Sequence, residues 1–102
     1  MLGSAIADAV GTSVEFMEPN SFKPVRDLIG GGVFNLQPGQ WTDDTSMALC
    51  LAESLIESRQ HDGFDQSERY VRWFREGHLS STGEWYLIHP SSVVVAVILA
   101  FI

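Results

Sequence analysis

The pattern of hydrophobic and polar positions predicts three helices. In residues 2–15, large apolar residues recur at every fourth position beside a stripe of small residues, which would allow another helix to approach closely. In residues 45–59 an apolar face repeats at helical spacing, with acidic residues on the opposite side. In residues 66–76 aromatic side chains supply the apolar face, and Gly77 ends the segment. We therefore expect an all-α fold.

The segments between and after these helices are less regular. Residues 16–41 show no period and contain several prolines and glycines, so they predict a long loop. Asp65 and Glu68 have the spacing of a capping box at the start of the third helix. Residues 80–83 predict a second polar loop. Residues 93–98 are so rich in β-branched side chains that their pattern fits either a strand or a buried helix.

The length and charge of the chain limit the class of protein. With 102 residues it has the size of one small domain with a single core. Its net charge of −7 argues against binding to nucleic acid or to an anionic membrane through a basic surface. Cys50 is the single cysteine, so no internal disulfide can form, and we expect a reducing, cytoplasmic setting.

The C-terminal part of the sequence has an unusual composition. The last charged residue is Glu84, and residues 93–102 are all apolar. Ten residues are about half of the ~20 that a membrane-spanning helix needs, so we do not expect a membrane anchor. The segment resembles a core element whose partner is missing, and it could also dock on a partner or support self-association.

Candidate metal ligands lie at the predicted start of the second helix. Thr42, Asp43, Asp44 and Thr45 place two carboxylates and two hydroxyls in succession. Hard cations such as Mg²⁺ prefer oxygen ligands of this kind. The same residue types are also preferred at helix N-termini, where they bond free amides and complement the helix dipole. Spacing alone leaves a helix cap and a metal site open, and it favours the cap.

Other residues with possible chemistry have simpler alternatives. Asp8 and Glu15 are seven residues apart, so on one helix they would return to nearly the same face, about 10 Å apart. Glu15 could be a general base or an outer metal ligand, or only a solvated carboxylate at a helix end. The three histidines lack metal-ligand spacing, and Cys50 fits a buried, inert thiol.

Three motifs occur in order along the chain. They are Gly3-x-x-x-Ala7-Asp8-Ala9-Val10-Gly11-x-x-x-Glu15-Phe16, Gly39-x-Trp41-Thr42-Asp43-Asp44-Thr45-x-Met47-Ala48-Leu49 and Tyr70-x-x-Trp73-x-x-x-Gly77-x-x-Ser80-x-Thr82-Gly83. Together they resemble the N-terminal third of the ADP-ribosylglycohydrolase family, over residues 3 to about 86. The middle motif with its flanks is the most specific of the three.

The resemblance implies a metal-dependent hydrolase with an all-α fold. Its substrate would be an ADP-ribosylated protein or a related ADP-ribose conjugate, cleaved at a site with two divalent metals, Mg²⁺ or Mn²⁺. The metals would orient the ribose hydroxyls and a water, while carboxylates manage protons. The residues implied are Glu15 as a catalytic carboxylate, Thr42, Asp43 and Asp44 as the first cluster of metal ligands, and Ser80, Thr82 and Gly83 as substrate-binding residues.

The resemblance ends near residue 86. Leu87 stands where the family has an Asp that is expected to contact the substrate, and the second, Asp-rich cluster of metal ligands is absent. We therefore divide the chain into residues 1–86, the N-terminal part of an ADP-ribosylglycohydrolase-like domain, and residues 87–102, an apolar tail. The expectation is a truncated domain with little or no turnover. The alternative is a non-catalytic helical module whose tail binds a partner.

Overall fold

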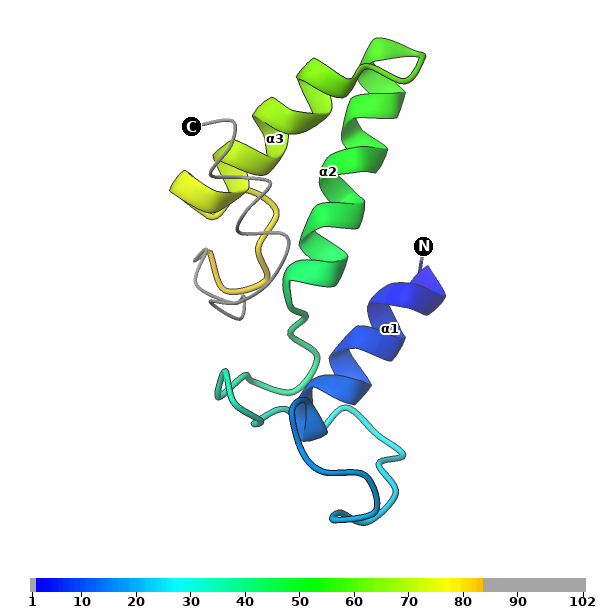
Figure 1. The fold of residues 1–102 in the computed structure, drawn as a ribbon, viewed down its shortest axis with the longest axis vertical. Coiled ribbons are helices and arrows are strands. Elements are labelled where there is room, and N and C mark those ends of the chain that lie inside the picture. Colours follow the sequence, from blue (N-terminus) through cyan, green and yellow to red (C-terminus); the bar gives the residue numbers. More distant parts are fainter. Residues whose placement is uncertain (1, 84–102) are drawn as a thin grey trace.

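A computed structural model describes residues 2–83, and this part of the chain is helical (Figure 1). Apart from one isolated β-bridge it contains no strand, which confirms the predicted all-α class. The tail prediction for residues 87–102 and the undecided element at 93–98 lie outside the described residues. None of the helices between residues 2 and 83 is long and apolar enough to cross a membrane. The elements are α1 (Leu2–Gly11), the 3₁₀ turn η1 (Thr12–Val14), α2 (Asp43–Ser58) and α3 (Gly63–Glu76).

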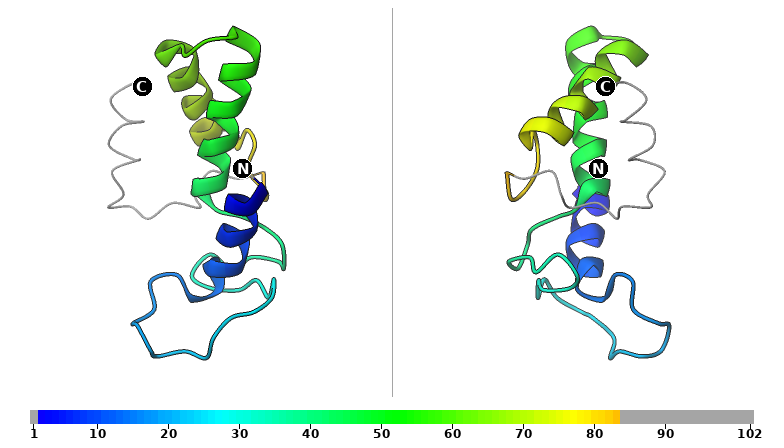
Figure 2. Two further views of the ribbon diagram at one scale, coloured as in Figure 1. Left: turned by 90° about the vertical axis from the view of Figure 1, so that its right-hand side faces the viewer. Right: turned by 60° about the vertical axis from the view of Figure 1, so that its left-hand side comes forward.

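Helices α2 and α3 form an antiparallel hairpin with a tight connection at one end (Figures 1 and 2). Its core is built around Cys50 of α2 and Trp73 of α3, which are 0% and 1% exposed. Partly buried apolar side chains surround this pair, and they are Met47, Tyr70, Phe74 and Leu79. The aromatic face predicted for the third helix packs on α2, but α2 meets it with a different side from the one predicted. Leu55 and Ile56 of the predicted apolar face are exposed, whereas Glu53 and Glu57 of the predicted polar side bond to Arg69 of α3.

The start of α3 differs from the prediction. The helix begins at Gly63, and Asp62 caps it, because its carboxylate accepts hydrogen bonds from the backbone amides of Phe64 and Asp65, both at 3.1 Å. The predicted capping box of Asp65 with Glu68 is therefore wrong. Asp65 lies inside the first turn, where its side chain faces Arg69 one turn later instead of a free amide.

Arg69 links the two helices of the hairpin. Its guanidinium bonds to Glu53 and, at 2.8 Å, to Glu57 on α2, and at 2.7 Å to Asp65 on α3. The Arg69 side chain is only 8% exposed, so the positive charge is held away from water by three carboxylates. The hydrogen bond from Arg69 lowers the pKa of Asp65 below its usual value, since it favours the charged form.

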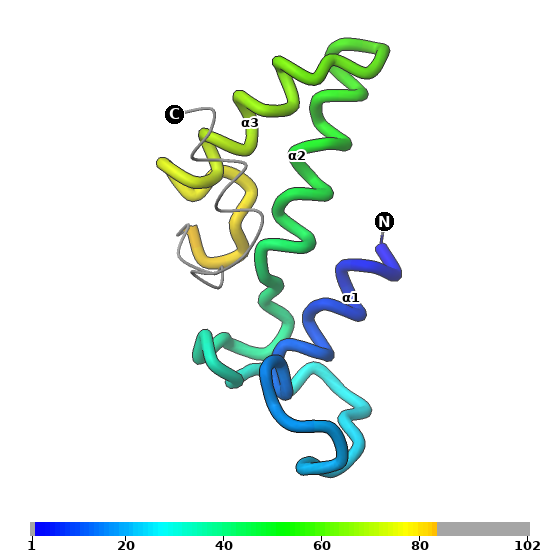
Figure 3. Tube along the Cα trace, viewed as in Figure 1, coloured from blue at the N-terminus to red at the C-terminus, as the bar shows by residue number. Residues whose placement is uncertain are grey.

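Helix α1 is shorter than predicted and uses a different face. The backbone leaves the α-helix after Gly11 and continues as η1, and Leu2 and Ile6 stay largely exposed. No other part of the described chain comes within contact distance of a Cβ placed at Gly3 or Gly11, so the small-residue stripe does not receive a helix there. Figure 3 shows α1 beside the beginning of α2, and Ala9 is its buried residue.

The long loop between η1 and α2 folds back onto the end of α1. Backbone hydrogen bonds between Gly31 and Leu36, at 2.7 and 3.0 Å, close a tight turn. Gly32 in this turn has φ +70° and lies against the Thr12 backbone, so closely that a Cβ there would collide with the Thr12 carbonyl oxygen. A side-chain-free residue with positive φ is therefore needed where the loop meets η1.

Candidate metal and hydrolase site

Asp8 joins α1 to the beginning of α2. Its Oδ1 accepts a hydrogen bond from the Thr42 hydroxyl at 2.6 Å, and its Oδ2 accepts one from the Thr42 amide at 2.9 Å. The same Oδ2 accepts the Thr45 hydroxyl at 2.7 Å and the Thr45 amide at 3.3 Å. Thr42 and Thr45 are 1% and 2% exposed, so these donors depend on Asp8 rather than on water.

The structure changes the interpretation of Thr42 as a helix cap. Thr42 occupies the N-cap position of α2 with extended backbone, yet its side chain makes no cap hydrogen bond. The cap acceptor is supplied by Asp8, which binds the amide of Thr45, the third residue of the helix. The role that spacing favours for the Thr42 side chain is thus carried out by a carboxylate from another helix.

Asp43, Asp44 and Glu15 form an acidic cluster close to this contact. Burial, followed by the charge of Asp44, raises the pKa of Asp43 to about 6. Burial and then the charge of Asp8 raise the pKa of Asp44. Burial, followed by the charges of Asp43 and Asp44, raises the pKa of Glu15. Each neighbouring charge acts to repel, and among residues 2–83 no ion pair involves any of the three.

A cavity of about 460 Å³ opens beside these carboxylates. Ala7 and Gly11 of α1 line it, so the small-residue stripe borders a space instead of packing against a helix. Asp8 and Glu15 both line this cavity, so they do share one side as predicted, although η1 interrupts the helix between them. The cavity wall consists of Ser4, Ala7, Asp8, Gly11, Thr12, Val14, Glu15 and Asp44.

The predicted substrate loop lies next to the same segment of chain. Ser81 receives a hydrogen bond from the Trp41 amide at 3.0 Å and donates one to the Trp41 carbonyl at 2.8 Å. Ser80 and Thr82 bond to each other through their hydroxyls at 3.1 Å, and Gly83 follows with φ +77°. The structure thus holds residues 80–83 next to the residue that precedes Thr42, through a serine that sequence reasoning did not select.

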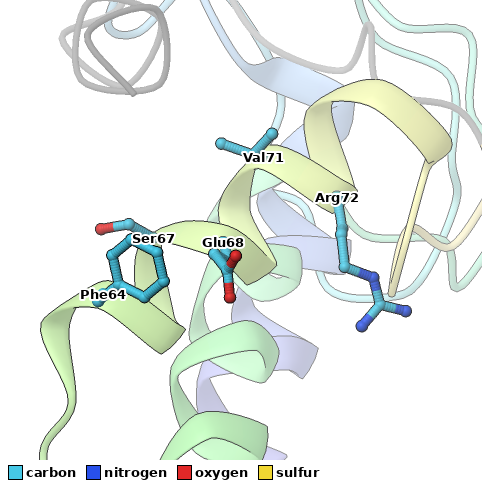
Figure 4. A pocket seen from close by; sticks show the side chains of 5 residues that line it. All are labelled: Phe64, Ser67, Glu68, Val71 and Arg72. Atoms are coloured by element: carbon cyan, nitrogen blue, oxygen red, sulfur yellow. The ribbon is translucent and has the colours of Figure 1, made fainter. Parts of the chain in front are cut away.

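The remaining candidates lie away from the acidic cluster. Cys50 is fully buried, as predicted, and burial raises the pKa of its thiol to about 11, which disfavours the reactive thiolate. His78 Nε2 lies 3.2 Å from Glu53, and His61 is exposed, while His89 is outside the described residues. A second hollow, of about 350 Å³, lies on the outer face of α3 (Figure 4) and contains none of the predicted site residues.

The oxygen atoms gathered here are of the kind that bind divalent cations, but they do not make a complete metal site. Carboxylate and hydroxyl oxygens are the ligands of Mg²⁺ and Mn²⁺, and a cation would offset the burial and the neighbouring charges that raise the pKa of Asp43. In the described part of the chain, however, no three His, Cys, Asp or Glu side chains are gathered closely enough to hold a metal ion. Residues 2–83 therefore fit as part of a ligand set. The roles predicted for Thr42, Asp43, Asp44 and Glu15 stay predictions.

Comparison with known proteins decides the family. The sequence profile described as ADP-ribosylglycohydrolase matches residues 1–101. The chain belongs to the ADP-ribosylglycohydrolase family. The match includes residues 87–101, where the sequence alone suggested no resemblance.

Relatives with assigned activities are similar over most of this chain. The ADP-ribosylarginine hydrolase Tri1 of Serratia proteamaculans is 52% identical over 86 residues, which are 84% of this chain and 23% of that protein. The ADP-ribosyl-[dinitrogen reductase] glycohydrolase of Rhodospirillum rubrum is 40% identical over 78 residues, or 72% of this chain and 26% of that protein. A solved structure named as an ADP-ribosylglycohydrolase-related protein complex has a TM-score of 0.70 and 55% identity, covering 76% of this chain and 27% of that chain. The chain thus spans about a quarter of the length of its relatives.

The raised pKa of Asp43 predicts how pH affects stability in the presence of EDTA. The folded state holds the proton more tightly than the unfolded state does, with a pKa of about 6 against 3.8. Stability therefore falls as pH rises from about 4 to 6 and stays reduced above that range. Asp43→Asn removes this penalty, so it should stabilise the protein by about 1 kcal/mol at pH 7 after screening by solvent, and by almost nothing at pH 4.

Urea unfolding of both proteins across this pH range measures the difference. Glu18→Gln, a change at an exposed loop carboxylate, is the matched control and should leave the pH profile unchanged. An Asp43→Asn protein less stable than the unmodified chain at pH 7 would show that the carboxylate stabilises the fold.

Proposed function

We propose that the chain contributes the first metal-ligand cluster and a catalytic carboxylate of a hydrolase that removes ADP-ribose from modified arginine or related side chains. The observation that supports this most is that Asp44 and Glu15 line one cavity beside Asp43, where burial and neighbouring carboxylates raise the pKa of all three and no ion pair within residues 2–83 compensates them. Such an arrangement is costly for a protein without a cation to offset it.

The residues would divide the work as follows. Thr42, Asp43 and Asp44 would hold a divalent cation, Mg²⁺ or Mn²⁺, which when bound supplies positive charge that orients ribose hydroxyls and water. Glu15, half-buried with a raised pKa, can accept a proton from the attacking water and return it to the leaving side chain. The water oxygen bonds to the anomeric carbon as the bond to the side-chain atom breaks. Ser80, Thr82 and Gly83 would contact the substrate.

The relatives indicate which acceptor to test first. Two are named ADP-ribosylarginine hydrolase, and one is named for ADP-ribosylated dinitrogen reductase. A protein carrying ADP-ribose on arginine is therefore the proposed substrate class. This activity belongs to the whole protein, whereas the metal-binding step can be measured on these residues.

Metal titration of the 102-residue chain by calorimetry tests the proposal. We expect Mn²⁺ or Mg²⁺ to bind, and the double substitution Asp43→Ala with Asp44→Ala to weaken binding at least about 10-fold, because both carboxylates are removed. A matched control, Glu18→Ala with Asp27→Ala, removes the same charge from an exposed part of the loop and should leave the affinity unchanged. An unmodified chain that binds no metal at millimolar concentration would contradict the proposal and favour a non-catalytic helical module.

A further inference from the structure

The carboxylate of Asp8 is almost fully occupied by protein donors. Oδ2 accepts three hydrogen bonds, from the amide and hydroxyl of Thr45 and from the amide of Thr42. Oδ1 accepts the Thr42 hydroxyl. A carboxylate offers about four lone-pair positions, so Oδ2 has no capacity left for another partner. This occupancy indicates that Asp8 acts on neighbouring residues more than on a ligand.

The four bonds bracket the two acidic residues at the start of α2. Thr42 precedes Asp43, and Thr45 follows Asp44, so the backbone on both sides of the pair is held by one side chain. Within α2 itself no side chain caps this end, since Thr42 makes no cap hydrogen bond. The orientation of the first helical turn therefore depends on α1.

Without Asp8, the first turn of α2 could adopt a different arrangement of hydrogen bonds. The Thr42 hydroxyl, no longer held by Oδ1, could rotate to accept from an amide of its own helix, as a serine or threonine N-cap usually does. The buried amide and hydroxyl of Thr45 would lose their acceptor as well. Both changes would alter the directions in which Asp43 and Asp44 project.

We propose that Asp8 is a positioning residue that sets the geometry of the Asp43 and Asp44 carboxylates for cation binding. The inference rests on the proposed function, because it concerns the same cation. Asp8 acts through the Thr42 and Thr45 contacts, and it makes metal affinity depend on the docking of α1 against α2. Outer partners that orient metal ligands typically change affinity 10–100-fold when they are removed.

Mn²⁺ titration of the full 102-residue chain with Asp8→Asn tests this role. Asparagine keeps the size and one oxygen acceptor but cannot accept at both branches, so we expect affinity to fall about 10–100-fold. Thr45→Val removes a single bond to Oδ2 with little change of volume, and a smaller loss of about 3–10-fold is expected. Circular dichroism at the titration temperature verifies that each variant is folded. Where Asp8→Asn does not fold, Thr45→Val decides.

Arg69→Met separates positioning from general loss of stability. Arg69 bonds to Glu53, ten residues and about 15 Å along α2 from Asp43. Its removal should destabilise the hairpin yet change Mn²⁺ affinity less than about 3-fold. A spectroscopic readout accompanies the titration, since bound Mn²⁺ broadens the carboxyl signals of Asp43 and Asp44, and Asp8→Asn should weaken this broadening at equal metal concentration whereas Arg69→Met should not.

The outcomes distinguish the inference from the proposed function. Unchanged affinity in folded Asp8→Asn and in Thr45→Val, beside normal binding by the unmodified chain, would overturn the positioning role alone. An equal loss of affinity in Arg69→Met would also overturn it. No binding by the unmodified chain would overturn the proposed metal function, and the positioning role with it.

Discussion

Replacing Arg69 with methionine should lower the midpoint of thermal unfolding by roughly 10 °C or more, because it leaves clustered carboxylates without their shared cation. Glu53 and Asp65 are only 27% and 29% exposed, so solvent compensates them poorly. Methionine keeps the apolar stem of the side chain, so the loss reports the charge and not the packing. Differential scanning calorimetry at pH 7 measures the midpoint.

The same variant should show a changed response to acid. The lowered pKa of Asp65 contributes stability that is present above about pH 4 and lost as pH falls through the folded-state pKa. Without Arg69 that contribution is gone, so the difference in unfolding midpoint between the variant and the unmodified protein should become smaller below pH 4. Arg75→Met, an exposed arginine on the same helix, is the control and should shift the midpoint little. A similar loss in both variants would mean that the interhelical contacts of Arg69 add nothing.

Replacing Gly32 with alanine should lower the free energy of unfolding by about 3 kcal/mol. Two effects add at this position. The φ of +70° disfavours any side chain, and the new Cβ would collide with the carbonyl oxygen of Thr12, which is backbone and cannot rotate away. Urea unfolding monitored by tryptophan fluorescence gives the free energy.

The adjacent glycine provides the matched control. Gly31 has nearly the same φ, +77°, yet within residues 2–83 no atom beyond its two chain neighbours lies within 4 Å of a Cβ placed there. Gly31→Ala should therefore cost only the backbone strain, about 1–2 kcal/mol. The difference between the two substitutions measures the contact of the loop with η1. Equal losses would show that the loop can move away from η1 without a further loss of stability.

The two helices of the hairpin follow from local pattern, but the side of α2 that meets α3 does not. Of the predicted apolar face of α2 only Met47 joins the core of Cys50 and Trp73, and Arg69 draws the acidic side of α2 to α3 instead. The start of α3 differs from the prediction because two acidic residues, Asp62 and Asp65, both fit a cap. Sequence spacing does not show which of them finds free amides and which finds Arg69. Tertiary contacts decide which of two such acidic residues caps the helix.

The site is assembled by contacts between segments far apart in the sequence, and no local pattern reveals such contacts. The motif around Thr42 was predicted from its residue types, and the family match supports the resemblance behind it. The sequence pattern shows Asp8 only as a charge on a helical face, whereas its function as cap acceptor comes from the docking of α1 onto α2. The apolar stripe of α1 predicts packing that is not observed, since Leu2 and Ile6 stay largely exposed within the described residues.

The hydrogen bonds of Asp8 join positions 34 to 37 residues apart, across the long loop, whereas the hairpin contacts are much closer in sequence. Closing a long loop costs chain entropy that a local hairpin does not incur. The α2–α3 pair should therefore form first during folding, and α1 should be the first element to detach from the native protein. A cation that binds only the assembled arrangement would slow this detachment, so hydrogen exchange at the Thr42 and Thr45 amides would report metal occupancy directly.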